Sequence, residues 1–155
     1  MSLKELAKDK DEYIREMVPE RPNAPSDILE IMAKDDSCGI RAKVAKNCNT
    51  PVHVLETLAK EQVDIVRAGV ARNINTPVYL LRVLAKDEVE HVHEMVASNV
   101  NTPIDILVTL AKSDNTYVRD EIAQNTSTPV ATLKMLVEDD DDYISAAAKL
   151  SLALV

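Results

Sequence analysis

The stretch Asn47-Cys48-Asn49-Thr50-Pro51 recurs along the chain with little change. It reads N-I-N-T-P at 73–77 and N-V-N-T-P at 99–103, and weaker copies read N-T-S-T-P at 125–129 and R-P-N-A-P at 21–25. The prolines at positions 25, 51, 77, 103 and 129 follow one another at steps of 26 residues. A fixed period of this length predicts a repeat protein, in which one supersecondary unit is stacked on the next.

The recurring motif combines residues that end one helix and begin another. Thr50 is expected to cap a helix N-terminus with its hydroxyl, and Pro51 suits the first helical position, where its missing N–H costs nothing. Asn47 and Asn49 suit the left-handed conformation that ends many helices, and Asn side chains at turns normally satisfy buried backbone groups. A structural role for these Asn residues is therefore favoured over a ligand-binding role.

Apolar residues follow each proline at helical spacing. Leu55 and Leu58 lie on one face of a first helix that we expect to span about ten residues. Val66 and Val70 repeat this spacing after an acidic linker whose side chains can cap a second helix. Neither helix is long enough to be stable alone in water, so stacking must stabilise both. The leucine column is complete in all copies: Leu3, Leu29, Leu55, Leu81, Leu107 and Leu133.

The sequence therefore predicts an all-α solenoid of six two-helix repeats, forming a single domain over residues 1–155. Residues 1–24 are predicted to be an N-terminal capping repeat, in which Ser2 and Glu5 form a capping box. Residues 129–155 are predicted to be a C-terminal capping repeat with an apolar tail. This tail either extends the last helix over the end of the stack or forms a homodimer contact, because an apolar tail is costly to leave in water.

Composition excludes several other classes of protein. Only two Gly residues occur, which argues against a turn-rich β architecture. The formal net charge of −8 disfavours general binding to nucleic acid or to anionic membranes, since both require a cationic face. No apolar run approaches membrane-spanning length, and residues 1–5 lack the apolar segment of a signal peptide. A cytoplasmic location is therefore expected.

Residues 66–85 carry the pattern V-R-x-x-V-A-x-N-x-N-T-P-x-x-x-L-x-x-L-A, and similar copies cover nearly the whole chain. This pattern resembles the leucine-rich repeat variant family. The resemblance implies a right-handed superhelix without a sheet, in which α-helices alternate with shorter, sometimes 3₁₀, helices, and it implies no general enzymatic activity. Some members carry an iron–sulfur cluster, which normally needs four thiolates, whereas this chain has only Cys38 and Cys48. No cofactor, metal site or catalytic residue is therefore expected.

A column of basic residues runs through the repeats. Its members are Arg15, Arg41, Arg67 and Arg119, with His93 and Ser145 in the remaining copies. Because stacked helices lie about 8 to 10 Å apart, these residues could form a cationic track for anions, phosphates or acidic peptides. The favoured interpretation is architectural, with each guanidinium bonded to helix-end carbonyls or to an acid six residues earlier, namely Asp9, Asp35 or Glu61.

Other clusters are interpreted as structural. His91 and His93 face different ways on a helix and cannot form a metal-binding i, i+4 pair. The column of His91, which contains Tyr13, Ile65, Tyr117 and Tyr143, is expected to be a half-buried packing column, and Cys48 is expected to be a small core residue. The acidic run 138–142 lacks the glycine and the alternating ligands of a calcium loop, so a solvated helix cap is favoured.

A protein- or peptide-binding scaffold is the function that these observations favour. Two columns vary between copies and are expected on exposed faces of the second helix: Ala42, Ala68, Glu94 and Asp120, and Lys46, Arg72, Ser98 and Gln124. The alternative is binding of a nucleic-acid phosphate backbone along the Arg column with Lys43, Lys46 and Arg72, which the overall charge and the few aromatics oppose. The candidate partner-binding residues are Arg41, Arg67, Arg72, Glu94, Asp120 and Gln124.

Overall fold

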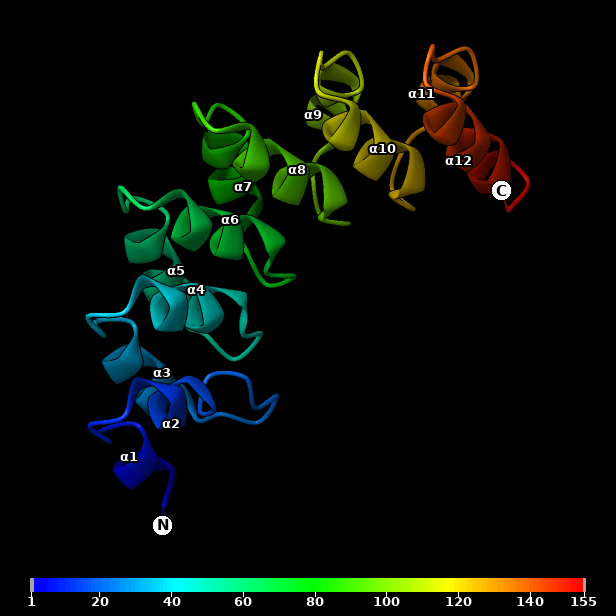
Figure 1. The fold of residues 1–155 in the computed structure, drawn as a ribbon. Coiled ribbons are helices and arrows are strands. Elements are labelled where there is room, and N and C mark those ends of the chain that lie inside the picture. Colours follow the sequence, from blue (N-terminus) through cyan, green and yellow to red (C-terminus); the bar gives the residue numbers. More distant parts are fainter. Residues whose placement is uncertain (1, 155) are drawn as a thin grey trace. The chain divides into compact units, whose positions relative to one another are not determined.

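A computed structural model describes residues 2–154, and every regular element in this range is a helix (Figure 1). The helices form six consecutive pairs, one pair for each repeat, so the predicted all-α repeat fold is confirmed. The first members of the pairs are α1 (Leu3–Leu6), α3 (Ser26–Met32), α5 (Val52–Leu58), α7 (Val78–Leu84), α9 (Ile104–Leu110) and α11 (Val130–Leu136). The second members are α2 (Glu12–Glu16), α4 (Cys38–Lys46), α6 (Asp64–Arg72), α8 (Glu90–Ser98), α10 (Thr116–Gln124) and α12 (Asp142–Leu152).

The second helix of a pair is the longer one, which corrects the expected lengths. The first helix α5 has 7 residues rather than about ten, whereas α6 has 9 residues and is an α-helix rather than a 3₁₀-helix. The first helix is short because its last turn tightens: the N–H of Lys60 donates to the carbonyl of Thr57, and the N–H of Glu61 donates to that of Leu58. These i to i−3 bonds satisfy terminal carbonyls and stop the α-helical pattern.

The Thr-Pro pair is used differently from the sequence expectation. Pro51 is the N-cap residue of α5, with φ −60° and ψ 147°, and its carbonyl accepts from the N–H of Val54 at 2.9 Å. The hydroxyl of Thr50 points backward and donates to the carbonyl of Val44 at 2.5 Å. The expectation that Thr50 caps the following helix is therefore wrong, because its hydroxyl bonds a carbonyl in the last turn of the preceding helix, α4.

The Asn residues join neighbouring repeats. Asn73 Nδ2 donates to the carbonyls of Ala45 and Asn47, 28 and 26 residues earlier, at 2.7 and 2.8 Å. Asn125 Nδ2 makes the equivalent bonds to the carbonyls of Ala97 and Asn99. The prediction that these side chains satisfy buried backbone is confirmed. The prediction of a left-handed conformation for Asn47 and Asn49 is wrong, since no non-glycine residue in the described range has a positive φ.

The core consists of the repeated apolar columns. Leu55, Leu58, Val66 and Val70 are all at most 1% exposed, which places both helices of a pair against the same interior. By its backbone contacts the chain divides into two compact units, unit 1 (residues 1–80) and unit 2 (residues 81–155), and α7 crosses the boundary. Within unit 1, α4 packs on α6, and within unit 2, α10 packs on both α8 and α12.

The two ends differ from the internal repeats. Ser2 and Glu5 form the predicted capping box at the start of α1. At the other end α12 has 11 residues, and Ser151, which occupies the Asn position of the repeat, donates from Oγ to the carbonyl of Ala123 at 2.7 Å. The tail therefore extends the last helix as expected, and the homodimer contact stays a prediction. In residues 2–154 no helix has the length and apolar character needed to cross a membrane.

Candidate functional site

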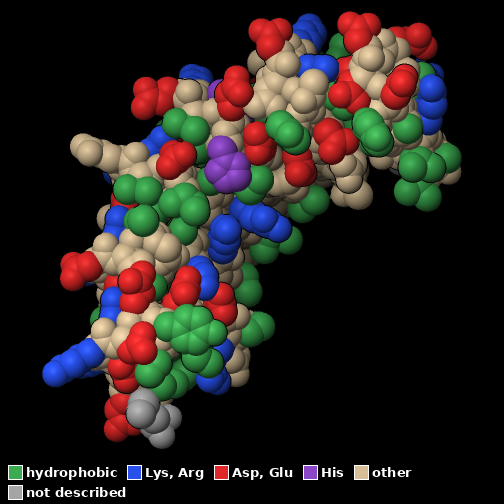
Figure 2. All heavy atoms as spheres, in the orientation of Figure 1, with side chains coloured by type: hydrophobic (Ala, Val, Ile, Leu, Met, Phe, Trp, Pro, Cys, Tyr) green, Lys and Arg blue, Asp and Glu red, His purple; other side chains and the backbone are tan. Residues whose placement is uncertain are grey.

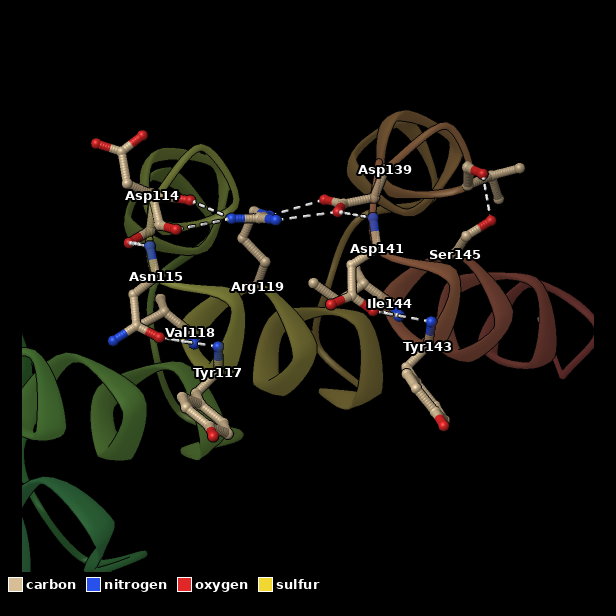
Figure 3. A network of polar contacts seen from close by, with 12 residues as sticks. Asp114, Asn115, Tyr117, Val118, Arg119, Asp139, Asp141, Tyr143, Ile144 and Ser145 are labelled. Carbon is tan, nitrogen blue, oxygen red and sulfur yellow. Dashed lines mark hydrogen bonds and ion pairs between the residues drawn. The ribbon is translucent and has the colours of Figure 1, made fainter.

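Arg15, Arg41 and Arg119 of the Arg column form the same set of contacts, which we call the Arg clamp. Arg119 Nη1 donates to the carbonyls of Ser113 and Asp114, six and five residues earlier, at 2.8 and 3.2 Å. Its Nε and Nη2 donate to the Asp139 carboxylate of the next repeat at 2.7 and 3.0 Å (Figure 3). One guanidinium therefore ties together the end of its own linker and the linker of the following repeat.

The clamp recurs in unit 1. Arg41 Nη1 donates to the carbonyls of Asp35 and Asp36, while its Nε and Nη2 donate to the Glu61 carboxylate at 2.7 and 2.9 Å. Arg15 is bound in the same way by its linker carbonyls and by the Asp35 carboxylate. The architectural interpretation is thus confirmed with one correction. The acid six residues earlier offers its carbonyl, and the carboxylate partner comes 20 residues later.

Pairing in the clamp changes the electrostatics of its members. The hydrogen bond from Arg119 lowers the pKa of Asp139 below its usual value, and the hydrogen bond from Arg15 does the same for the pKa of Asp35. The hydrogen bond from Arg119 to Asp139 in turn raises the pKa of the Arg119 guanidinium. Because these guanidinium donors are directed at protein oxygens, the Arg column offers little donor capacity to an external phosphate.

The repeat that contains α8 lacks the clamp. His93 stands at the Arg position in α8, and Ser113 stands at the position of its acid partner. The Nε2 atom of His93 is buried and has no hydrogen-bond partner among the described residues. Ser113 keeps one function of the acid, because its Oγ accepts from the N–H of Asn115 at 3.2 Å, as the Asp139 carboxylate does from that of Asp141. Arginine and acid are thus both absent from this repeat.

The second helices share a second feature, which we call the outer face. It consists of the second, fifth, sixth and ninth helical positions, whose spacing of three, four and seven places them on one side of a helix. The outer face contains both variable columns that the sequence singled out. In unit 1 it comprises Tyr13 and Glu16 of the short helix α2, Gly39, Ala42, Lys43 and Lys46 of α4, and Ile65, Ala68, Gly69 and Arg72 of α6. In unit 2 it comprises His91, Glu94, Met95 and Ser98 of α8, Tyr117, Asp120, Glu121 and Gln124 of α10, and Tyr143, Ala146, Ala147 and Leu150 of α12.

The outer face of unit 1 is largely closed by helix packing. Ala42 and Ala68 are 3% and 1% exposed, so the expectation that both lie on an exposed face is wrong. The cause is the close approach of α4 to α6, since a Cβ built on Gly69 would lie 2.8 Å from the Ala42 carbonyl oxygen. The side chains that stay exposed on the outer face of α4 and α6 are Lys46 and Arg72, at the C-terminal ends of the two helices, and Ile65, which is 43% exposed.

The outer face of unit 2 is open and carries aromatic rings. Tyr117 and Tyr143 are 71% and 85% exposed, so their assignment to a half-buried packing column is wrong. Their rings project to the same side of α10 and α12 (Figure 3). Figure 2 shows hydrophobic and acidic side chains next to each other on the drawn face of this unit. The recurrence of Tyr and His in this column was visible in the sequence, but the exposure of these residues depends on how the helices rotate.

The remaining predicted clusters have structural roles. Asp139 accepts from Arg119, and Asp141 caps α12 by accepting from the N–H of Tyr143 at 2.9 Å, which supports the helix-cap interpretation of the acidic run. Cys48 is exposed and unpaired, so its assignment to the core is wrong. No group of three or more His, Cys, Asp and Glu side chains within residues 2–154 is arranged to hold a metal ion.

The structure separates the six candidate partner-binding residues into two groups. Arg41 and Arg67 lie in the Arg column, where Arg67 is buried and donates to the carbonyls of Glu61 and Gln62. The other four lie on outer faces: Arg72, Glu94, Asp120 and Gln124. Of these, Arg72 and Gln124 are exposed, whereas Glu94 and Asp120 are half-buried and bonded to His91 and Gln124 respectively.

Two solved structures are similar to this chain in fold. One structure, described as a leucine-rich repeat variant with a novel repetitive structural motif, aligns over 99% of this chain and 71% of its own with a TM-score of 0.66. The chain has the fold of a leucine-rich repeat variant. Sequence identity to that leucine-rich repeat variant is 23%. The crystal structure of an engineered protein also aligns, over 97% of this chain and 94% of its own, with a TM-score of 0.56 and 15% identity. No family model matches the sequence, and no curated protein does. The handedness of the superhelix stays a prediction.

Proposed function

We propose that this protein is a non-enzymatic scaffold that binds a protein or peptide through the outer faces of its second helices. The observation that carries the proposal is the contrast between constant and variable columns. The core leucines and the linking Asn residues repeat, whereas the ninth helical position changes from Lys46 and Arg72 in unit 1 to Gln124 in unit 2. An exposed surface that varies over a repeated core is what a repeat scaffold needs to individualise its binding face.

Binding of nucleic acid along the Arg column is the alternative to this proposal. The Arg clamps count against it, because three of the four column arginines, Arg15, Arg41 and Arg119, each donate to two carbonyls and one carboxylate. The charge of unit 2 counts against it too: six Lys and Arg face thirteen Asp and Glu, a net charge of −7. A polyanion would be repelled by such a unit. The cytoplasmic location stays a prediction from the sequence.

Site-resolved photo-crosslinking tests the proposal. A photoreactive amino acid is placed at Gln124 on the outer face of α10, and in a matched control at Thr109, which is exposed on the first helix α9. Both chains are irradiated in native cell extract, with and without nuclease. We expect a discrete protein adduct from position 124 that survives nuclease and is absent or much weaker from position 109.

The opposite results would overturn the proposal in different ways. Adducts of equal yield from both positions would show that the outer face has no special role. Nuclease-sensitive adducts that disappear in the Arg41→Ala plus Arg67→Ala variant would assign the function to nucleic acid instead. For that variant, a far-UV circular dichroism spectrum like that of the unaltered chain shows that the fold is intact.

A further inference from the structure

We infer that the outer face of unit 2 is a docking surface for an extended, arginine-rich peptide, with cationic side chains at every third residue. The inference rests on the proposed function and names the class of partner. It is carried by three observations: the exposed aromatic rings, the acidic side chains on α8 and α10, and the regular spacing of the helices.

No hydrogen bond of the phenol groups within residues 2–154 explains the exposure of the aromatic rings. Tyr117 and Tyr143 stand at the second position of α10 and α12, where the N-cap side chains of Asn115 and Asp141 accept from their backbone N–H groups at 2.8 and 2.9 Å. The N-cap contacts therefore fix the backbone of both residues. Neither phenol oxygen has a hydrogen-bond partner in residues 2–154, unlike that of Tyr79, which donates to the Glu56 carboxylate. Large exposed aromatic side chains with no internal partner are typical of binding surfaces.

The charge on the outer faces of α8 and α10 selects a cationic partner. Asp120 and Glu121 follow Tyr117 by three and four residues, so they lie on the same side of α10. Glu94 occupies the corresponding position on α8, beside His91. Arginine complements both features of the surface, because its planar guanidinium stacks on an aromatic face and also bonds a carboxylate with two donors.

The spacing of the helices sets the spacing of the peptide. α8, α10 and α12 pack in series, and Asn115 Nδ2 at the start of α10 donates to the Glu90 carboxylate at the start of α8 at 2.6 Å. Packed helices lie about 8 to 10 Å apart, and an extended or polyproline II peptide advances about 3.1 to 3.4 Å per residue. Three peptide residues therefore span one repeat. In a polyproline II helix with three residues per turn, every third side chain also points to the same side.

Fluorescence anisotropy with designed peptides tests the inference on the full chain. The probe is a labelled peptide of sequence (Arg-Pro-Ala)₄, and its control has the same composition with the four arginines contiguous. We expect the spaced peptide to bind at least about tenfold more tightly, because only its arginines match the repeat of the rings. The affinity of the spaced peptide should fall with added salt, since its charged contacts are solvent-exposed.

Tyrosine variants locate the binding site. Tyr117→Ala plus Tyr143→Ala should weaken binding of the spaced peptide by at least about tenfold, whereas Tyr117→Phe plus Tyr143→Phe should leave it within about twofold, because ring stacking does not need the hydroxyl. The matched control is Tyr13→Ala, which removes an equally exposed ring, 74% exposed, from the same column in unit 1. Tyr13→Ala should leave the affinity unchanged.

Several results would overturn the inference. Equal affinity for the spaced and contiguous peptides would reduce the interaction to net charge, and equal loss on Tyr13→Ala would remove the assignment to unit 2. Absence of peptide binding would also contradict it. If the nuclease-resistant adduct at position 124 is nevertheless obtained, the scaffold function stands and only the peptide class is wrong. If neither peptide binding nor the nuclease-resistant adduct at position 124 is obtained, the scaffold function is wrong as well.

Discussion

The α10–α12 and α8–α10 pairs of unit 2 are built on the same repeat, but only the first is held by an Arg clamp. Arg119 on α10 reaches the Asp139 carboxylate ahead of α12, whereas His93 and Ser113 replace both residues in the preceding pair. Both pairs nevertheless pack their helices together and bury the same apolar columns. The difference shows that the apolar core is enough to form the stack. The arginine and its acid partner are therefore a link that is added to the apolar core.

The largest effect is expected from the core, which the two pairs share. Leu107 of α9 is fully buried, and α9 packs on both α8 and α10. Leu107→Ala should lower the free energy of unfolding by about 2 to 5 kcal/mol, because it removes buried methyl groups and leaves a cavity. Urea unfolding followed by circular dichroism measures the change. A loss no greater than that from removing a clamp would mean that the core does not dominate the stack.

Removing the clamp should have the next largest effect. Arg119→Met keeps most of the aliphatic stem but removes the guanidinium donors from the carbonyls of Ser113 and Asp114 and from the Asp139 carboxylate. The free energy of unfolding should fall by about 1.5 to 3 kcal/mol, the range for hydrogen bonds that involve a charged group. Asp139→Asn is the partner variant. The combined variant should lose less than the sum of the two single losses, and strict additivity would contradict a shared interaction.

Acid should weaken the clamped pair selectively. The folded-state pKa of Asp139 is lowered by the hydrogen bond from Arg119, so this carboxylate binds its proton less readily when folded than when unfolded. Its contribution to stability is therefore complete above the unfolded pKa, about 4, and is lost as the pH falls through the lowered folded pKa. The stability difference between the native chain and Asp139→Asn should shrink below about pH 4. A difference that is constant from pH 3 to pH 7 would contradict the clamp as its cause.

The smallest effect is expected from building the missing clamp. His93→Arg plus Ser113→Asp restores both members of the link and also removes the buried Nε2 atom that lacks a partner. The gain should be about 0.5 to 1.5 kcal/mol, the usual net contribution of a hydrogen bond, and appears as a higher melting temperature. Each single substitution serves as a control and should give little or no gain. A double variant no more stable than the native chain would show that the two pairs differ in backbone geometry as well as in side chains.

Periodicity predicted the number of helices and the buried columns, because the 26-residue step and the spacing of Leu and Val depend only on local geometry. The direction of side chains at the junctions was less predictable. A Thr before a Pro can cap the helix ahead or bond the helix behind, and the extended ψ of Pro51 decides for the second arrangement. The partner of each arginine was likewise placed in the wrong repeat, since a carboxylate 20 residues ahead comes within reach only after stacking.

The outer face was the least predictable region. Whether Ala68 is exposed depends on how closely two helices approach, and the approach of α4 to α6 is set by Gly69. The sequence contains a signal of this close approach, because a helical glycine beside two alanine positions permits a close backbone contact. The exposure of Tyr117 and Tyr143 has no comparable signal, since aromatic residues at regular spacing are equally typical of a core.

The amide bonds between repeats have a direction, and it matches the direction of protein synthesis. Asn47, Asn73 and Asn125 each donate to carbonyls 26 and 28 residues earlier in the chain. The N-terminus of the chain leaves the ribosome first. Every such amide therefore emerges after its acceptors, and each new repeat can dock on one that is already made. Shortening the chain from its C-terminus leaves these amides satisfied, whereas shortening it from its N-terminus deprives the first remaining Asn of its partners.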